Sequence, residues 1–189
     1  MNMNFKEVMD ISPAKFADCS LGKKLDSKIF NLSPEIADQP LAIMYDRCKN
    51  CPIENGSWTG ERGESKWNPD REYVPLKANP NERTWGDILR QYKINGIVFE
   101  DGEPDFSEID KGTVEIKSFS DSRDDNFEKA DIELASLRGC LPSEVKKWRK
   151  ENGYTWHECR DMKTMLKVPG IVHNNISHSG GISEAKKGA

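Results

Sequence analysis

The chain has 189 residues, of which 32% are charged and 35% hydrophobic, and its 28 basic and 32 acidic side chains give a formal charge of −4. This length suits one domain with or without an accessory segment and excludes a multidomain enzyme. No apolar run approaches the roughly 20 residues that cross a bilayer, and the first ten residues lack the pattern of a signal peptide. We therefore expect no membrane insertion, and export would need a specialised machine or a fused carrier.

The charge is unevenly distributed along the chain. Residues 144–189 hold nine basic and five acidic side chains, whereas residues 1–143 carry a net charge of −8. The whole chain is thus not a uniformly basic nucleic-acid coat, and its last quarter is the part that can approach a polyanion. A basic solvated face on a terminal helix would give the same asymmetry.

The five cysteines are odd in number and irregularly spaced, which argues against a disulfide framework and favours a reducing compartment. Cys48 and Cys51 have the spacing of a zinc knuckle, but no second pair completes a tetrahedral site. Cys159 lies close to a histidine, yet the pattern is too sparse to indicate a nucleophile.

The first half of the chain gives the weaker signals. Residues 34–48 are predicted to form a helix with Ser33 as its N-cap. Residues 52–75 are rich in Gly, Pro, Trp, Asn and Asp and are predicted to form a loop. We place the domain boundary at the end of this loop, with residues 1–75 as a delivery, linker or accessory segment and residues 76–189 as the second domain.

Sharper signals begin at Thr84. Thr84 and Asp87 resemble a capping box that opens a helix to about Tyr92. Apolar and β-branched residues then predict strands at 97–99 and 113–116, on either side of a turn region.

Two helices are predicted next. Asp125 or Asn126 caps the first helix and Gly139 ends it, while Pro142 lies in the first turn of the second helix, residues 143–152. The second helix carries a basic face suited to a DNA backbone, although such faces are commonly only solvated: Lys146, Lys147, Arg149 and Lys150.

The last part of the chain predicts a hairpin followed by a helix. Residues 154–158 and 164–168 favour two antiparallel strands, and Pro169 suits the first turn of a helix that the glycines at 180 and 181 terminate just after His178. Trp156 is expected to face the core and to support the helix that bears His173.

All three histidines of the chain, His157, His173 and His178, fall within 22 residues of this hairpin and helix. A cluster of this kind favours a metal or acid–base site. Five residues on an ideal helix turn through roughly 140° beyond one full circle, so His173 and His178 can share one ion only if the helix ends between them. Together with Glu158, three imidazoles could hold a divalent cation and leave one position open.

These residues resemble the WHH family of nucleases in the HNH/endonuclease VII superfamily, the ββα-metal or His-Me finger enzymes. The resemblance covers about residues 96–181 and rests on Trp156-His157, Val168-Pro169 before a helix, and the paired histidines with Gly-Gly. Residues 104–108, 114–116 and 123–131 also look like the lead-in of that family. It implies an α+β fold with a ββα-metal core at the C-terminus behind a helical, loop-rich N-terminal segment. Two departures stand out: Glu158 replaces the usual second histidine, and the second strand lacks the asparagine that orients the general base.

The resemblance implies a metal-dependent endonuclease that hydrolyses DNA phosphodiester bonds as an interbacterial toxin. Its cofactor would be one divalent ion, such as Mg²⁺, Mn²⁺, Zn²⁺ or Ni²⁺. Its partners would be DNA, a cognate immunity protein and a secretion-system carrier. The protein would stay in the producer's cytoplasm with its immunity protein and would act, once secreted or injected, in the cytoplasm of the target cell.

Two assignments of roles remain open. In the first, His157 is the general base, and His173 and His178 hold the metal with help from Glu158. In the second, His157 completes a three-histidine metal site and Glu158 activates the water. The near-neutral pKa of an ordinary imidazole favours the first. Arg160 and Lys163, at the hairpin turn, are expected to bind the substrate phosphate.

Two further interpretations compete with a DNase. The histidines could bind zinc only to hold the fold of a non-catalytic nucleic-acid-binding module, and chelation would then melt the domain rather than stop cleavage. Alternatively, an enzyme of the same fold could cleave RNA, because no residue identifies a contact with a 2′-hydroxyl group.

Overall fold

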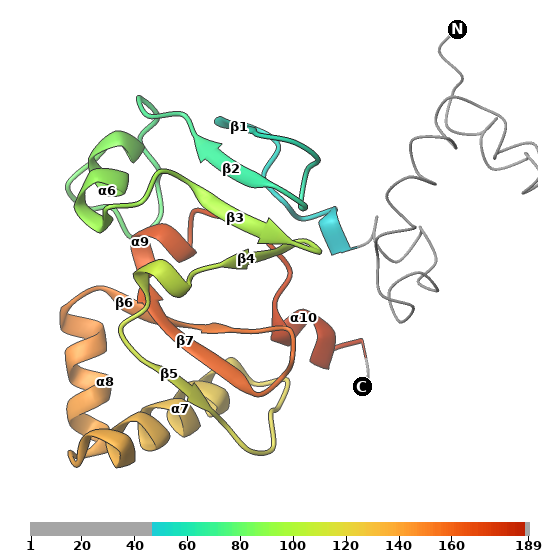
Figure 1. Ribbon diagram of the computed structural model, residues 1–189. Helices are drawn as coiled ribbons and strands as arrows, with labels where there is room; N and C mark the ends of the chain where they lie inside the picture. The colour runs from blue at the N-terminus through green and yellow to red at the C-terminus, as the bar shows by residue number, and fades with distance from the viewer. Residues whose placement is uncertain (1–46, 188–189) are drawn as a thin grey trace, which may run out of the picture. The chain divides into compact units, whose positions relative to one another are not determined.

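The computed structural model of the chain describes residues 47–187 (Figure 1). These residues belong to a compact unit that begins at Met44. The helix predicted over residues 34–48 lies outside the described residues except for its last two positions. No helix within residues 47–187 is long and apolar enough to cross a membrane.

The first sheet contains four antiparallel strands in the order β1-β2-β3-β4. They are β1 (Gly56–Trp58), β2 (Lys66–Pro69), β3 (Ile97–Glu100) and β4 (Glu103–Asp105). Strands β1 and β2 lie in the region predicted as a loop. Trp58 lies opposite Trp67 with ring centroids 5.3 Å apart, and aromatic cross-strand pairs of this kind stabilise even short strands. The compact unit therefore extends well before residue 75.

Helix α6 (Trp85–Tyr92) packs against the core of this sheet, as the sequence predicts. The side chain of Thr84 accepts a hydrogen bond from the backbone N–H of Asp87, and Lys93 ends the helix in the left-handed conformation. Its apolar face buries Trp85, Ile88 and Leu89. The backbone N–H groups of Trp85 and Gly86 donate to the carbonyls of Tyr73 and Arg71, which ties the preceding loop to the start of the helix.

The second sheet contains three antiparallel strands in the order β5-β7-β6. They are β5 (Thr113–Glu115), β6 (Tyr154–Glu158) and β7 (Thr164–Pro169). The predicted hairpin is confirmed, with His157 opposite Leu166. The strands predicted at 97–99 and 113–116 lie in different sheets, since β4 and a short 3₁₀ turn, Ser107–Ile109, separate them.

Helices α7 (Arg123–Arg138) and α8 (Pro142–Glu151) pack against the second sheet, on the side away from the first (Figure 1). Helix α7 begins earlier than predicted, because the hydroxyl of Ser122 caps it while the amide of Asn126 is buried in other contacts. Gly139 ends α7 with a φ of 64°, as predicted. The fold is mixed α+β, in agreement with the sequence.

The helix after the hairpin is shorter than predicted. Helix α9 (Gly170–His173) has four residues, and α10 (Gly181–Ala185) follows an irregular segment. The N–H of Asn175 donates to the carbonyl of Val172, three residues back, while its side-chain amide donates to Ile171. The change from a hydrogen bond four residues back to one three residues back ends the α-helical pattern after His173.

Candidate metal centre

Three imidazoles from three segments lie together between the two sheets. His157 comes from β6, His173 is the last residue of α9, and His178 belongs to the irregular segment that follows. The ring centroids are 5.0 to 5.3 Å apart, and one nitrogen from each ring lies within 4.8 Å of the others. The early end of α9 allows His178 to return to the side of His173.

Two of the three rings have an acceptor near the nitrogen that faces away from the cluster. Nδ1 of His178 lies 2.8 Å from the carbonyl of Ile176, and Nδ1 of His173 lies 3.2 Å from the side-chain oxygen of Asn174. Protons on these nitrogens leave the Nε2 lone pairs for the cluster. Nε2 of His173 lies 3.3 Å from Nδ1 of His157.

His157 is buried more deeply than the other two histidines. Its side chain is 1% exposed, and its Nε2 has no hydrogen-bond partner among the described residues. A carboxylate oxygen of Glu103 lies 3.7 Å from this nitrogen, as an ion-pair neighbour just beyond hydrogen-bond distance. A small movement of Glu103 would give His157 the same outward acceptor that the other two rings have.

An apolar wall borders the three imidazoles, and burial favours the neutral form of His173 and His178. The fully buried ring of Phe106 contacts all three, with centroid distances of 5.0, 5.7 and 5.9 Å. Burial, followed by the neighbouring imidazoles, lowers the pKa of His173 well below its ordinary value and that of His178 to about 4. Neutral imidazole is the form that binds metal ions.

The two glycines after His178 allow the chain to pass close to the end of β6. A Cβ atom at Gly180 would lie 2.7 Å from the carbonyl oxygen of Glu158, and one at Gly181 would lie 2.5 Å from that of Cys159. Both distances are too short for any other residue type. The Gly-Gly pair thus has a steric role in placing His178.

Glu158 lies beside the cluster and is held by two residues of α7. Its carboxylate accepts hydrogen bonds from Nε of Arg123 at 3.1 Å and from the side-chain amide of Asn126 at 2.9 Å. Asn126 is fully buried, and the Arg123 side chain is 61% exposed. The nuclease family that the sequence resembles has its orienting asparagine on the second strand of the hairpin, whereas Asn126 lies on α7.

A cavity of about 630 Å³ opens beside these groups. Its walls include the three histidines and Glu158, with Arg123 and Lys77 as the basic side chains among them. Most of the remaining wall comes from the segment that follows α9 and from the first three residues of α10: Asn174, Ile176, Ser177, Gly180, Gly181, Ile182 and Ser183.

The two basic residues predicted to bind phosphate do not line this cavity. The guanidinium of Arg160 donates to the carboxylate of Asp101 at 2.9 Å and to its backbone carbonyl at 2.6 Å, and the side chain is 14% exposed. Lys163 lies at the hairpin turn, with its ammonium 3.5 Å from Glu115. Both are engaged away from the histidines.

The reverse face of β6 holds a separate buried network. Arg149 and Trp156 both donate to the carboxylate of Asp131, so Arg149 is not part of the exposed basic face of α8. Trp156 packs among residues of α7, α8 and the second sheet rather than against α9. Its expected role of supporting the histidine helix is therefore wrong, because alternate strand residues face opposite sides of a sheet.

Four residues at the site were not assigned to it from the sequence: Glu103, Phe106, Arg123 and Asn126. Each comes from a segment 31 to 54 positions before His157, and no local spacing links them to the histidines. The signal that was available was the similarity of residues 104–108 and 123–131 to the lead-in of the nuclease family.

The donor set fits a divalent transition-metal ion. Two imidazole nitrogens bound at 2.0–2.1 Å in tetrahedral geometry lie about 3.3 Å apart, which matches the His157–His173 distance. An all-nitrogen set suits Zn²⁺ or Ni²⁺ better than Mg²⁺, which prefers oxygen ligands.

Part of the chain is similar to a family of known proteins. Residues 96–180 match the family model for the DNase/tRNase domain of colicin-like bacteriocins. No curated protein matches the chain. The matched segment includes all three histidines, Glu158, Arg123 and Asn126. The chain thus contains a region similar to a nuclease toxin domain, and the histidine cluster is that region's candidate metal centre.

Proposed function

We propose that this protein is a metal-dependent endonuclease that cleaves the phosphodiester bonds of DNA as an interbacterial toxin. One observation carries the proposal: three imidazoles converge beside a cavity, inside the segment that matches a DNase/tRNase domain. A bound divalent ion would act there as a Lewis acid and stabilise negative charge on the scissile phosphate and its leaving oxygen.

Burial supports the metal-ligand role for His157 over the general-base role. A base must reach a water molecule, whereas Nδ1 of His157 faces His173 and its Nε2 faces Glu103 inside the protein. We therefore favour a site in which His157, His173 and His178 hold the ion. We assign the proton-accepting role to Glu158, which lines the cavity and is oriented by Asn126.

The basic groups that line the cavity suit the substrate phosphate better than Arg160 and Lys163. Arg123 uses its Nε for Glu158, which leaves its two terminal nitrogens to donate to phosphate oxygens. Lys77, which comes from a loop that precedes the histidines in the sequence, lines the same cavity. We propose these two residues as the phosphate contacts.

The cellular setting follows from the similarity to bacteriocins. A cell that makes such an enzyme needs an inhibitor, so we propose a cognate immunity protein as partner and a secretion system or carrier for delivery. We further propose a delivery or linking role for the part of residues 1–75 that precedes the compact unit, and cleavage in the cytoplasm of the target cell.

Plasmid cleavage tests the assignment. Supercoiled plasmid is incubated with wild type, His157→Ala, Glu158→Gln and Glu151→Gln, each with Zn²⁺, Ni²⁺, Mn²⁺ or Mg²⁺ and then with EDTA. Glu151 is the matched control, since it is an exposed carboxylate on α8 paired only with Lys147 among the described residues. We expect wild type and Glu151→Gln to nick and linearise the plasmid until the chelator is added. Full activity of Glu158→Gln would overturn its role, and metal-independent cleavage would overturn the proposal.

The matched family includes tRNases, so RNA is the second candidate substrate. The same proteins are incubated with tRNA and with a single-stranded RNA. Cleavage of RNA but not plasmid would replace the DNase assignment with an RNase. Melting of the fold on chelation, with no cleavage of either substrate, would instead identify a structural metal site.

A further inference from the structure

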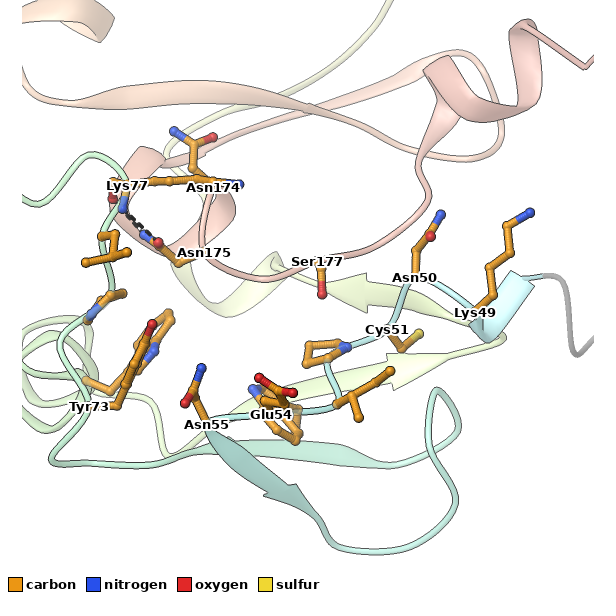
Figure 2. A pocket seen from close by; sticks show the side chains of 16 residues that line it. Lys49, Asn50, Cys51, Glu54, Asn55, Tyr73, Lys77, Asn174, Asn175 and Ser177 are labelled. Atoms are coloured by element: carbon orange, nitrogen blue, oxygen red, sulfur yellow. Dashed lines mark hydrogen bonds between the residues drawn. The ribbon is translucent and has the colours of Figure 1, made fainter.

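A second cavity, of about 530 Å³, adjoins the histidine cavity and shares four wall residues with it: Asn50, Lys77, Asn174 and Ser177. Figure 2 shows Asn174, Asn175 and Ser177 on one side of it, and Glu54, Asn55 and Tyr73 on the other. Most of its walls come from residues 49–85, which precede the segment that matches the nuclease family. The family match therefore assigns this cavity no role.

The walls combine aromatic rings with amides. Trp67 and Trp85 are 3% and 2% exposed, so they form fixed surfaces, while Tyr73 is half-buried. Asn55 is exposed at the end of the cavity near β1, and its side chain makes no hydrogen bond that the described residues show. The two tryptophans therefore form the floor, and the accessible groups are the ring of Tyr73 and the amide of Asn55, since the other wall amides are hydrogen-bonded within the protein. An aromatic ring and an amide of this kind are groups that proteins use to stack on nucleobases and to bind their edges.

Two hydrogen bonds between Asn175 and Lys77 connect this cavity to the segment that carries His173 and His178. The side-chain oxygen of Asn175 accepts from the backbone N–H of Lys77 at 2.9 Å, and its NH₂ group donates to the Lys77 carbonyl at 2.7 Å (Figure 2). Asn175 lies two residues after His173. The loop that carries Lys77 is thereby held at the junction of the two cavities, with the lysine side chain exposed.

We propose that this second cavity binds the base of a nucleotide next to the scissile phosphate. The proposal rests on the nuclease function proposed above and specifies its substrate. The volume lies in the usual range of small-ligand sites, about 300–1,000 Å³. A base can enter a hollow of this kind only when it is unpaired or turned out of the helix, so the enzyme prefers single-stranded or locally opened nucleic acid over intact duplex.

The test uses a single-stranded oligonucleotide with one abasic position and the same strand without it, in DNA and RNA versions. Cleavage rates of individual bonds are compared for wild type, Tyr73→Leu, Tyr73→Phe and Tyr154→Leu. Tyr154 is the matched control, because it is also half-buried but stacks on Trp148 outside both cavities. Thermal melting shows that each variant is folded.

Stacking of one base on an aromatic ring corresponds to roughly 5- to 150-fold in rate or affinity. We expect wild type to cut the bond beside the abasic position more slowly by this factor. Tyr73→Leu should lose a similar factor on the intact strand and become insensitive to the abasic position, whereas Tyr73→Phe and Tyr154→Leu should behave as wild type. Equal rates on both strands for wild type, or wild-type behaviour of Tyr73→Leu, would overturn the proposal.

Binding separates this proposal from the nuclease assignment. The tryptophan fluorescence of His157→Ala is titrated with the intact and the abasic strand, because Trp67 and Trp85 form part of the cavity wall. Tighter binding of the intact strand would support the base site even if the wild type cuts nothing. Equal binding of the two strands would overturn the base site even if cleavage is found.

Discussion

Strand β6 separates two buried polar clusters. They differ in whether groups of the protein itself form the hydrogen bonds that the cluster needs. Trp156 and His157 are neighbours in sequence and face opposite sides of the sheet. On the Trp156 side, both carboxylate oxygens of Asp131 accept hydrogen bonds, from Trp156 at 2.9 Å and from Arg149 at 2.7 and 3.1 Å. On the His157 side, one nitrogen from each of the three imidazoles lies within 4.8 Å of the others, and the buried Nε2 of His157 has no hydrogen-bond partner among the described residues.

This difference in hydrogen bonding suggests that one cluster contributes to stability and the other to function. The Asp131 network is closed, since its ion pair is 3% and 8% exposed and its hydrogen bonds are formed within the protein. The histidine cluster keeps lone pairs directed at a common point beside a cavity, which costs stability unless a ligand takes them up. We therefore expect changes on the first side to unfold the domain and changes on the second to abolish its chemistry.

Replacement of His173 by alanine should have the largest effect, and it should fall on activity. Loss of one of three metal ligands is expected to lower plasmid cleavage by at least about 100-fold. The metal-free variant should keep its stability within about 1 kcal/mol, because His173 is only partly buried and lines a cavity that water can enter. Cleavage assays and urea denaturation in EDTA measure the two quantities. A His173→Ala variant that is active, or that fails to fold, would contradict the expected difference between the histidine cluster and the Asp131 network.

Replacement of Asp131 by alanine should reverse this pattern. Removing the carboxylate leaves the buried guanidinium of Arg149 and the indole N–H of Trp156 without their acceptor, at an expected cost of about 3–5 kcal/mol of unfolding free energy. Urea denaturation measures the loss, and Glu128→Ala, at an exposed carboxylate of the same helix, is the control. A loss below about 1 kcal/mol would contradict the closed network.

Acidic pH should lower the stability of the metal-free protein through its histidine cluster. The pKa of His178 is about 4 in the folded protein against 6.5 ordinarily, so the unfolded chain binds more protons between these values. The contribution of His178 to the stability of the metal-free protein is therefore fully present above about pH 6.5. It is lost as pH falls towards 4, and the loss from this group is at most about 3 kcal/mol. The lowered pKa of His173 acts in the same direction.

Urea denaturation of wild type and His178→Gln in EDTA at pH 7, 5.5 and 4.5 measures this dependence. The difference between the two proteins isolates the contribution of His178 from that of the carboxylates. Parallel profiles for the two proteins would contradict the prediction.

Replacement of Glu103 by glutamine should have the smallest effect of the four. Contacts with His157 and the backbone N–H of Arg160 outweigh burial and lower the pKa of Glu103, so a carboxylate faces the buried His157 Nε2. Such outer acceptors contribute about 10- to 100-fold to metal affinity. Competition with a coloured chelator for Zn²⁺ measures the change, with Glu108→Gln as an exposed control. Equal Zn²⁺ affinity of Glu103→Gln and wild type would leave Glu103 without a role at the metal.

Local chemistry made much of the second half of the chain predictable. Thr84 before an apolar helix, Gly139 after another, and alternating residues in 154–168 each determine the conformation of their own neighbourhood. The hairpin at 56–69 was missed because its stability comes from cross-strand tryptophans and from pairing with β3, both of which lie outside the local sequence pattern.

The sequence by itself determined the α+β class, the hairpin and the presence of three histidines near one another along the chain, because these depend on contacts within a few residues. Only the tertiary structure decided which groups surround them. Glu103, Phe106, Arg123 and Asn126 reach the site from distant segments, and Asn175 both ends α9 and holds Lys77 beside the cavities. Long-range pairing and burial select such neighbours, and neither can be calculated from spacing along the chain.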